Sequence, residues 1–167
     1  MASDKAAIRD YAIIALLALN LGITTYATFW KSGSSPDTKE QSEPSNISEV
    51  QALKLANEVL ALYNSKDATG LYAKFDSVAK AQITQEQLTT QLENLYPVMG
   101  TPSSPAFVGS LLAGSDGGRE YTNLNYKIKL SDGPFSSGDM KLTVTERDSG
   151  LTLVGFFING TSQSNQK

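Results

Sequence analysis

Two reactive residue types are missing from this chain of 167 residues, which contains no cysteine and no histidine. Without cysteine it forms no disulfide, no thiolate metal site, no thiol nucleophile and no lipid anchor on a cysteine. Without histidine it lacks the side chain that proteins use most often as a general base and as a metal ligand. We therefore expect no metal, no cofactor and no catalytic residues.

A concentrated positive charge is also absent. Residues 49–167 carry ten Lys and Arg against twelve Asp and Glu, which gives a net charge of −2. Surfaces that bind nucleic acid usually carry a basic patch. The charge balance therefore predicts no nucleic-acid partner.

What the chain does contain is one long run without charge, residues 11–30. As a helix it would span about 30 Å, the thickness of the hydrocarbon core of a bilayer. A cleaved signal peptide is the competing interpretation, but its apolar core is shorter and Thr25-Tyr26-Ala27 is a poor cleavage site. Tyr26 and Trp30 are typical of the aromatic residues at a membrane interface. The run favours a retained, single transmembrane helix.

The segments on either side of this run set the expected topology. The counts of Lys and Arg before and after it are equal, so charge alone does not orient the helix. A head of residues 1–10 is easily left in the cytoplasm, and we expect the remainder to lie outside the bacterial inner membrane. Residues 31–48 are dominated by Ser, Pro, Glu, Gln and Lys and predict a flexible linker.

Two faces of the predicted transmembrane helix carry unusual residues. A face of small residues lets another helix approach closely and is a candidate packing surface. It comprises Ala15, Ala18, Gly22 and Thr25, and the polar residue Asn20 lies on the opposite side. The alternative is that small residues are simply common in membrane helices and that threonine hydroxyls bond their own backbone. Both interpretations stay open.

Capping patterns predict helices at the start of a soluble domain, residues 49–160. Ser48 with Gln51, and Thr84 with Gln87, have the spacing of a capping box, in which a side chain at each position accepts a backbone N–H. Apolar residues at helical spacing follow both boxes. The predicted helices are 49–64, 67–75, a further turn at 77–81, and a helix from Thr84 that is ended by Pro97 and Gly100.

After Gly100 the apolar pattern changes to alternation, which predicts strands. The expected strands are 106–113, 120–130, 139–147 and 151–159, with residues 161–167 as a frayed tail. Their inward faces carry Leu124, Tyr126, Ile128 and Leu130, then Met140, Leu142 and Val144. Short links between strands predict an antiparallel meander. Three helices followed by four antiparallel strands indicate an α+β fold with the helices on one face of the sheet.

This order of elements resembles the nuclear-transport-factor-2-like, or cystatin-like, cone superfamily. The resemblance is carried by Leu71–Asp76, Ile83–Leu88, Gly100 and Leu151–Phe156. Within that superfamily the chain is similar to a bacterial membrane-anchored family of unknown function. These motifs are structural, so the resemblance implies a fold and no active site.

Enzymes of the superfamily use an acid–base Asp or His with a Tyr inside the cone, so the resemblance implies a few weak pocket candidates. Asp76, Tyr72 and Tyr126 are these candidates, and Tyr63, Tyr96 and Tyr121 are the other tyrosines available. The structural interpretation is that Asp76 caps the following helical turn and that the tyrosines fill the core. We favour the structural interpretation, because two ordinary mechanisms account for every residue.

The last strand is apolar on both faces, unlike the two strands before it. Leu151, Leu153 and Phe157 form one face, and Val154, Phe156 and Ile158 form the other. Either a helix covers the second face or it meets another chain. Val154, Phe156 and Ile158 are therefore a candidate partner surface.

These patterns predict a non-enzymatic, membrane-anchored accessory or binding subunit of a bacterial inner-membrane protein complex. Its expected partners are other membrane-protein subunits or a second copy of the chain. The alternative is a membrane-tethered binder of a small ligand, or an isomerase-type enzyme, that uses a pocket inside the cone.

Overall fold

The computed structural model describes residues 46–148 and 150–161. The predicted transmembrane helix, with Ala15, Ala18, Asn20, Gly22 and Thr25, lies outside these residues, as do most of the linker and residues 162–167. No helix in the described ranges is both long and apolar enough to cross a membrane.

Four helices open the described domain. They are α2 (Glu49–Asn64), α3 (Ala68–Ala73), α4 (Ser77–Lys80) and α5 (Gln85–Met99). Both predicted capping boxes are confirmed, since Ser48 and Thr84 each accept the N–H of the glutamine three residues on, whose side chain binds the cap N–H. Local hydrogen bonding therefore sets the starts of the two long helices.

The end of α5 differs from the prediction in one respect. Pro97 lies inside the helix, which continues to Met99, so the expectation that Pro97 ends it is wrong. An interior proline weakens a helix, because it lacks an N–H and its ring crowds the carbonyl four residues earlier, but the residues after it can stay helical. Gly100 ends α5 as predicted, at a φ of 65°.

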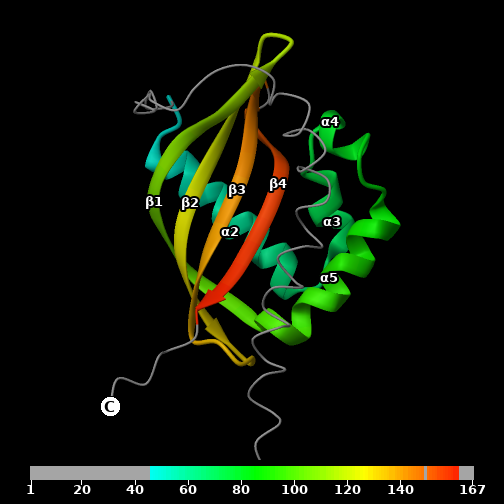
Figure 1. Ribbon diagram of the computed structural model, residues 1–167, viewed down its shortest axis with the longest axis vertical. Coiled ribbons are helices and arrows are strands. Elements are labelled where there is room, and N and C mark those ends of the chain that lie inside the picture. The colour runs from blue at the N-terminus through cyan, green and yellow to red at the C-terminus, as the bar shows by residue number, and fades with distance from the viewer. Residues whose placement is uncertain (1–45, 149, 162–167) are drawn as a thin grey trace, which may run out of the picture. The chain divides into compact units, whose positions relative to one another are not determined.

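Four strands follow and form one antiparallel sheet in the order of the chain (Figure 1). They are β1 (Thr101–Asp116), β2 (Arg119–Ser131), β3 (Ser137–Arg147) and β4 (Gly150–Thr161). The α+β expectation and the meander are confirmed. β1 begins five residues earlier than the expected 106. Its two prolines do not delay the start of the strand, because β1 is an edge strand with a register shift between Ser103 and Ala106, where a missing N–H is tolerated.

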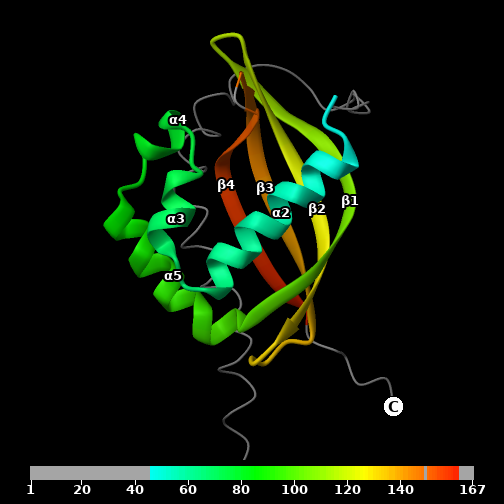
Figure 2. The ribbon, with the colours of Figure 1, turned by 180° about the vertical axis from the view of Figure 1, so that it is seen from behind.

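The core lies between the sheet and the helices. Figure 2 shows α2 crossing one face of the sheet, while α3, α4 and α5 lie beside β4. The predicted inward residues of β2 and β3 are all buried, from Leu124 to Val144. Tyr126 is 1% exposed, and its hydroxyl donates to the Ala52 carbonyl of α2 at 2.9 Å. This bond fixes α2 against the middle of the sheet.

The grouping of residues predicted for the two faces of β4 is wrong at Leu153 and Val154. Phe156 and Ile158 share a face as predicted, and both lie in the core at 5% and 4% exposure, where Leu153 joins them at 0%. Of the two alternatives for this face, cover within the chain therefore holds for Phe156 and Ile158. The cause of the wrong grouping is a register shift in which Thr143 pairs with Gly155 but Val144 pairs with Leu153, so that Val154 is the extra residue of a bulge. Because of the bulge, Leu153 and Phe156 face the same way, and Val154, which is half-buried, is the one member of the predicted partner surface outside the core.

Candidate functional site

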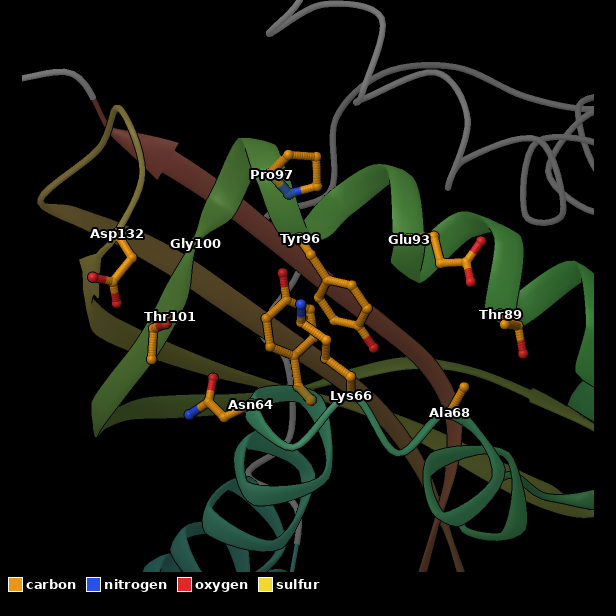
Figure 3. A pocket seen from close by; sticks show the side chains of 11 residues that line it. Asn64, Lys66, Ala68, Thr89, Glu93, Tyr96, Pro97, Gly100, Thr101 and Asp132 are labelled. Carbon is orange, nitrogen blue, oxygen red and sulfur yellow. The ribbon is translucent and has the colours of Figure 1, made fainter.

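A half-open cleft of about 560 Å³ lies where the last turn of α2 approaches the C-terminal half of α5 and the start of β1 (Figure 3). Its volume is within the range of small-ligand pockets, about 300–1,000 Å³. The lining residues are Tyr63, Asn64, Lys66, Ala68, Thr89, Glu93, Tyr96, Pro97, Gly100, Thr101 and Asp132.

Two backbone turns shape the cleft. Lys66 has a φ of 57°, and this left-handed residue turns the chain from α2 into α3, whose first turn is capped by Asp67 through the Gly70 N–H. Gly100 turns the chain from α5 into β1, and a Cβ there would overlap the Ser131 carbonyl oxygen. Glycine is therefore required at this corner both for its conformation and for its small size.

Tyr63 and Tyr96 form an aromatic pair in the cleft. Their ring centroids lie 4.9 Å apart at an interplanar angle of 65°, an edge-to-face arrangement. Tyr63 is 1% exposed. Both hydroxyl oxygens are buried, and neither has a hydrogen-bond partner in the described part of the chain. Nearly all buried polar groups in folded proteins are bonded, so these two hydroxyls are an unusual feature of the packing between α2 and α5.

Both phenols are neutral at physiological pH. Burial raises the pKa of the Tyr63 hydroxyl, and the neighbouring Tyr96 raises it further. Burial also raises the pKa of the Tyr96 hydroxyl, with smaller contributions from the carboxylates of Glu93 and Asp67. A neutral phenol can both donate and accept a hydrogen bond.

Three charged side chains line the cleft. Glu93 and Asp132 contribute two carboxylates, and Lys66 contributes one ammonium group, so the lining has a net charge of −1. The Lys66 ammonium nitrogen lies 5.6 Å from the centroid of the Tyr96 ring (Figure 3). The three charged groups are exposed side chains, which suits them to attract and hold a ligand.

Asp76, the acidic pocket candidate from the sequence, has a structural role. It caps α4 by accepting the Val78 N–H at 2.9 Å, and it binds Arg147 through Nε at 2.9 Å and Nη2 at 2.8 Å. Burial opposes ionisation of Asp76, but the bonds from Val78 and Arg147 outweigh it and hold the pKa of the carboxyl below its usual value. The predicted capping role is confirmed.

The two tyrosine pocket candidates also lie away from the cleft lining. Tyr72 is half-buried, with the Lys80 ammonium nitrogen 5.4 Å from its ring centroid, and the Tyr126 hydroxyl is bonded to Ala52. The sequence pointed to Tyr63 and Tyr96 only as two tyrosines among several. The available signal was their position in the last turn of each long helix, where side chains from two helix ends can meet.

No cluster of three or more acidic side chains placed to hold a metal occurs between residues 46 and 161, residue 149 aside. The arrangement at the cleft is one of aromatic rings, neutral hydroxyls and exposed charges. The lining contains no buried carboxylate poised for proton transfer.

Comparison with known proteins gives distant structural likenesses. No protein-family model and no curated protein matches the sequence. The chain is similar to the structure of Aln2 from a Streptomyces species, with 14% identity, a TM-score of 0.46, and coverage of 70% of this chain and 93% of that one. It is also similar to a protein from Novosphingobium aromaticivorans provisionally named as an aromatic ring hydroxylase, with 10% identity, a TM-score of 0.40, and coverage of 66% and 87%. Likenesses at this level assign neither a family nor an activity.

Proposed function

We propose that this chain is a non-enzymatic, single-pass membrane-anchored binding subunit of a bacterial inner-membrane complex. Its α+β domain lies outside the cytoplasm and recognises its partner through the Tyr63–Tyr96 cleft. We also infer that the domain belongs to the nuclear-transport-factor-2-like cone type, a proposal supported by helices that precede a four-stranded meander.

The observation that carries the binding role is the cleft itself, a space of about 560 Å³ that is partly open to solvent. Its lining combines the half-buried ring of Tyr96 with the exposed charged side chains of Lys66, Glu93 and Asp132. A cleft of this volume that combines an aromatic surface with a few polar groups is typical of a binding site.

The contacts of Asp76 favour a binding role over an isomerase-type enzyme. A general base must reach the proton it removes, and its pKa is usually raised toward neutrality. Asp76 instead has a lowered pKa and is occupied by the Arg147 guanidinium and the Val78 amide. The alternative of a tethered small-ligand binder uses the same cleft, and it predicts that no partner protein co-purifies with the wild-type chain.

The proposal is tested by blocking the cleft in the full chain. Thr89 lines the cleft, and the next residue of α5, Thr90, is exposed and outside it. Thr89→Arg should therefore fill the cleft, while Thr90→Arg adds the same side chain to the neighbouring surface. After extraction in mild detergent, partner proteins should co-purify with wild type and with Thr90→Arg, and should be lost with Thr89→Arg. Equal recovery with both variants, or a free monodisperse monomer for wild type, would contradict the proposal.

A further inference from the structure

We propose that two copies of this chain pair through the outer edge of β1, in antiparallel orientation, with residues 108–112 at the centre of the contact. The inference goes beyond the binding role of the cleft, because it assigns a second surface of the domain and names the partner for it. It is carried by three features of the described residues, which are the open edge of the sheet, the apolar side chains exposed there and the distribution of charge along the strand.

β1 forms the open edge of the sheet. In the described part of the chain, β2 is the one strand that pairs with it. The opposite edge strand, β4, is covered, since the backbone of Leu153 binds the backbones of Lys74 and Asp76 just before α4. An edge strand presents a row of backbone N–H and C=O groups to which another strand can bind. Each copy therefore has one edge to offer, and pairing closes at two copies.

Four large apolar side chains are exposed in the described part of the chain, and they gather at this edge. Val108, Leu111 and Leu112 of β1 are 63%, 48% and 45% exposed, and Val50, in the first turn of α2, is 77% exposed. Both ribbon views show the start of α2 beside β1 (Figures 1 and 2). Residues 106–116 contain no buried side chain. Exposed apolar residues gathered on one surface indicate a contact with another molecule.

The charges at the edge favour a second copy as the partner. Residues 101–115 carry no charged side chain, although edge strands that avoid pairing usually carry lysine or other charges. Pro102 and Pro105 protect only the start of the strand. The chain has a net charge of −3, so two copies repel each other on average. Pairing through β1 brings no like charges together, and an uncharged strand offers no ion pair to a charged partner.

The exposed apolar residues of β1 are arranged for self-pairing around Ser110. In an antiparallel pair of identical strands, a two-fold axis places residues equally far before and after it opposite each other. With the axis at Ser110, Val108 of one copy lies opposite Leu112 of the second copy, and the two copies of Leu111 lie diagonally across the junction. Gly109–Leu112 pairs with β2 without a register shift, so this part of the strand is regular. Each copy thus covers the apolar residues of the other.

Single cysteines test the pairing without background, because the chain has no cysteine of its own. Leu111→Cys would place two thiols about 7–8 Å apart across the junction, within reach of a short bismaleimide. Tagged and untagged full-length chains are expressed together, and intact cells are treated with the membrane-permeant reagent. The control is Asn94→Cys, at an exposed position of α5, which lies beside β4 (Figure 2).

We expect a crosslinked dimer that contains both tagged and untagged chains from Leu111→Cys, and none from Asn94→Cys. Equal dimer from both positions would overturn the inference, because it would mean that the chains meet at random. No dimer from Leu111→Cys, or a product with a different protein in its place, would also overturn it, because β1 would then be free or would bind another partner.

Charged substitutions test which residues lie opposite each other. Val108→Lys or Leu112→Glu alone places a charge against an apolar side chain and should lower the dimer yield of Leu111→Cys about fivefold. The two together place an ammonium group opposite a carboxylate and should restore most of the yield. Asn94→Lys should leave it unchanged. All three positions are exposed, so thermal unfolding should change little. Full yield in the single variants, or no recovery in the combined variant, would overturn the pairing.

This inference and the proposed function fail independently. The residue of β1 that lines the cleft is Thr101, seven positions before Val108. Thr89→Arg should therefore remove partner proteins and leave the crosslinked dimer, and Val108→Lys should do the reverse. Loss of the dimer in Thr89→Arg would overturn the inference, because the cleft would then hold the second copy. An intact dimer with no effect of Thr89→Arg on partner recovery would support the inference and contradict the proposed function.

Discussion

The carboxylate of Asp76 and the guanidinium of Arg147 are joined by two hydrogen bonds of 2.9 and 2.8 Å, although the residues are 71 positions apart in the chain. Asp76 is 5% exposed and also caps α4, while Arg147 ends β3. The pair therefore ties the helical layer to the sheet at one point, and Asp76 is unavailable as a base.

Removing the guanidinium should destabilise the domain. Arg147→Met would leave the buried carboxylate without a countercharge, bonded only to the Val78 N–H and to the Ser77 and Thr152 hydroxyls, and we expect a loss of about 2 kcal/mol in the free energy of unfolding. Lys127→Met is the matched control, because Lys127 pairs with Asp139 at the surface, where the two side chains are 68% and 47% exposed. Its effect should stay below about 1 kcal/mol. Urea unfolding measures both, and equal losses would contradict the structural role of the buried pair.

The same pair predicts how stability falls in acid. The folded-state pKa of Asp76 is below its unfolded value, so the unfolded chain binds the proton more readily. The stability that this group contributes is present above about pH 4 and is lost as the pH falls further, through the folded-state pKa. Asp76→Asn should be less stable at pH 7 and should lose less on acidification. A variant with the acid dependence of wild type would show that other carboxylates control it.

Two tyrosine-to-phenylalanine changes should have opposite effects. Tyr126→Phe removes the bond from the hydroxyl to the Ala52 carbonyl and should cost about 1 kcal/mol. Tyr63→Phe removes a buried hydroxyl that has no protein partner in the described residues, so it should cost nothing and can stabilise by up to about 1 kcal/mol. Thermal unfolding of the two variants makes the comparison. A loss in Tyr63→Phe equal to that in Tyr126→Phe would show that the Tyr63 hydroxyl is bonded.

A methyl group at Gly100 should disrupt the corner between α5 and β1. Gly100→Ala combines a left-handed φ with an overlap on the Ser131 carbonyl oxygen, and we expect a loss of about 3 kcal/mol or more. In the control Gly155→Ala, the added Cβ would lie at an ordinary 3.4 Å from Thr143, and the change should be below about 1 kcal/mol. Denaturant midpoints report both. A mild effect at Gly100 would mean that the corner can rearrange.

The cleft should also affect stability in alkali. Burial raises the pKa of the Tyr96 hydroxyl, and Glu93 and Asp67 raise it further, so the folded chain holds this proton more tightly than the unfolded chain. The stability that this difference contributes is fully present below the unfolded pKa, near 10, and is lost as the pH rises through the folded-state pKa. Glu93→Gln removes one neighbouring carboxylate and should lower the pKa of Tyr96 toward 10. Absorbance titration at the phenolate band compares the variant with wild type. An unchanged titration curve would place Glu93 too far away to act on the cleft.

The sequence predicts best what depends on neighbours along the chain. The capping boxes of Ser48 and Thr84 involve residues three apart, and the alternation along β2 and β3 repeats every two residues, so both are visible in the sequence. The faces of β4 were wrong because its bulge is set by pairing with Thr143 and Val144 on another strand. Pairing between strands leaves no local signal.

The candidate site was beyond prediction for a similar reason. Tyr63 lies in the last turn of α2 and Tyr96 in the last turn of α5, and α3 and α4 lie between them in the chain. Nothing in the local pattern of either residue shows that the two rings meet or that their hydroxyls lack partners. The capping role of Asp76 was predictable, because the N–H that it accepts belongs to Val78, two residues further on. Its pairing with Arg147 was not predictable, because Arg147 lies far away in the sequence.

The central claim is that the domain works by binding through the Tyr63–Tyr96 cleft. The most direct measurement is photo-crosslinking in intact membranes, with a photoreactive amino acid in place of Thr89 in the cleft or of Lys129, an exposed residue of β2 outside it. The account predicts a discrete crosslinked product from position 89 and no such product from position 129. Equal products from both positions, or none from position 89, would contradict it.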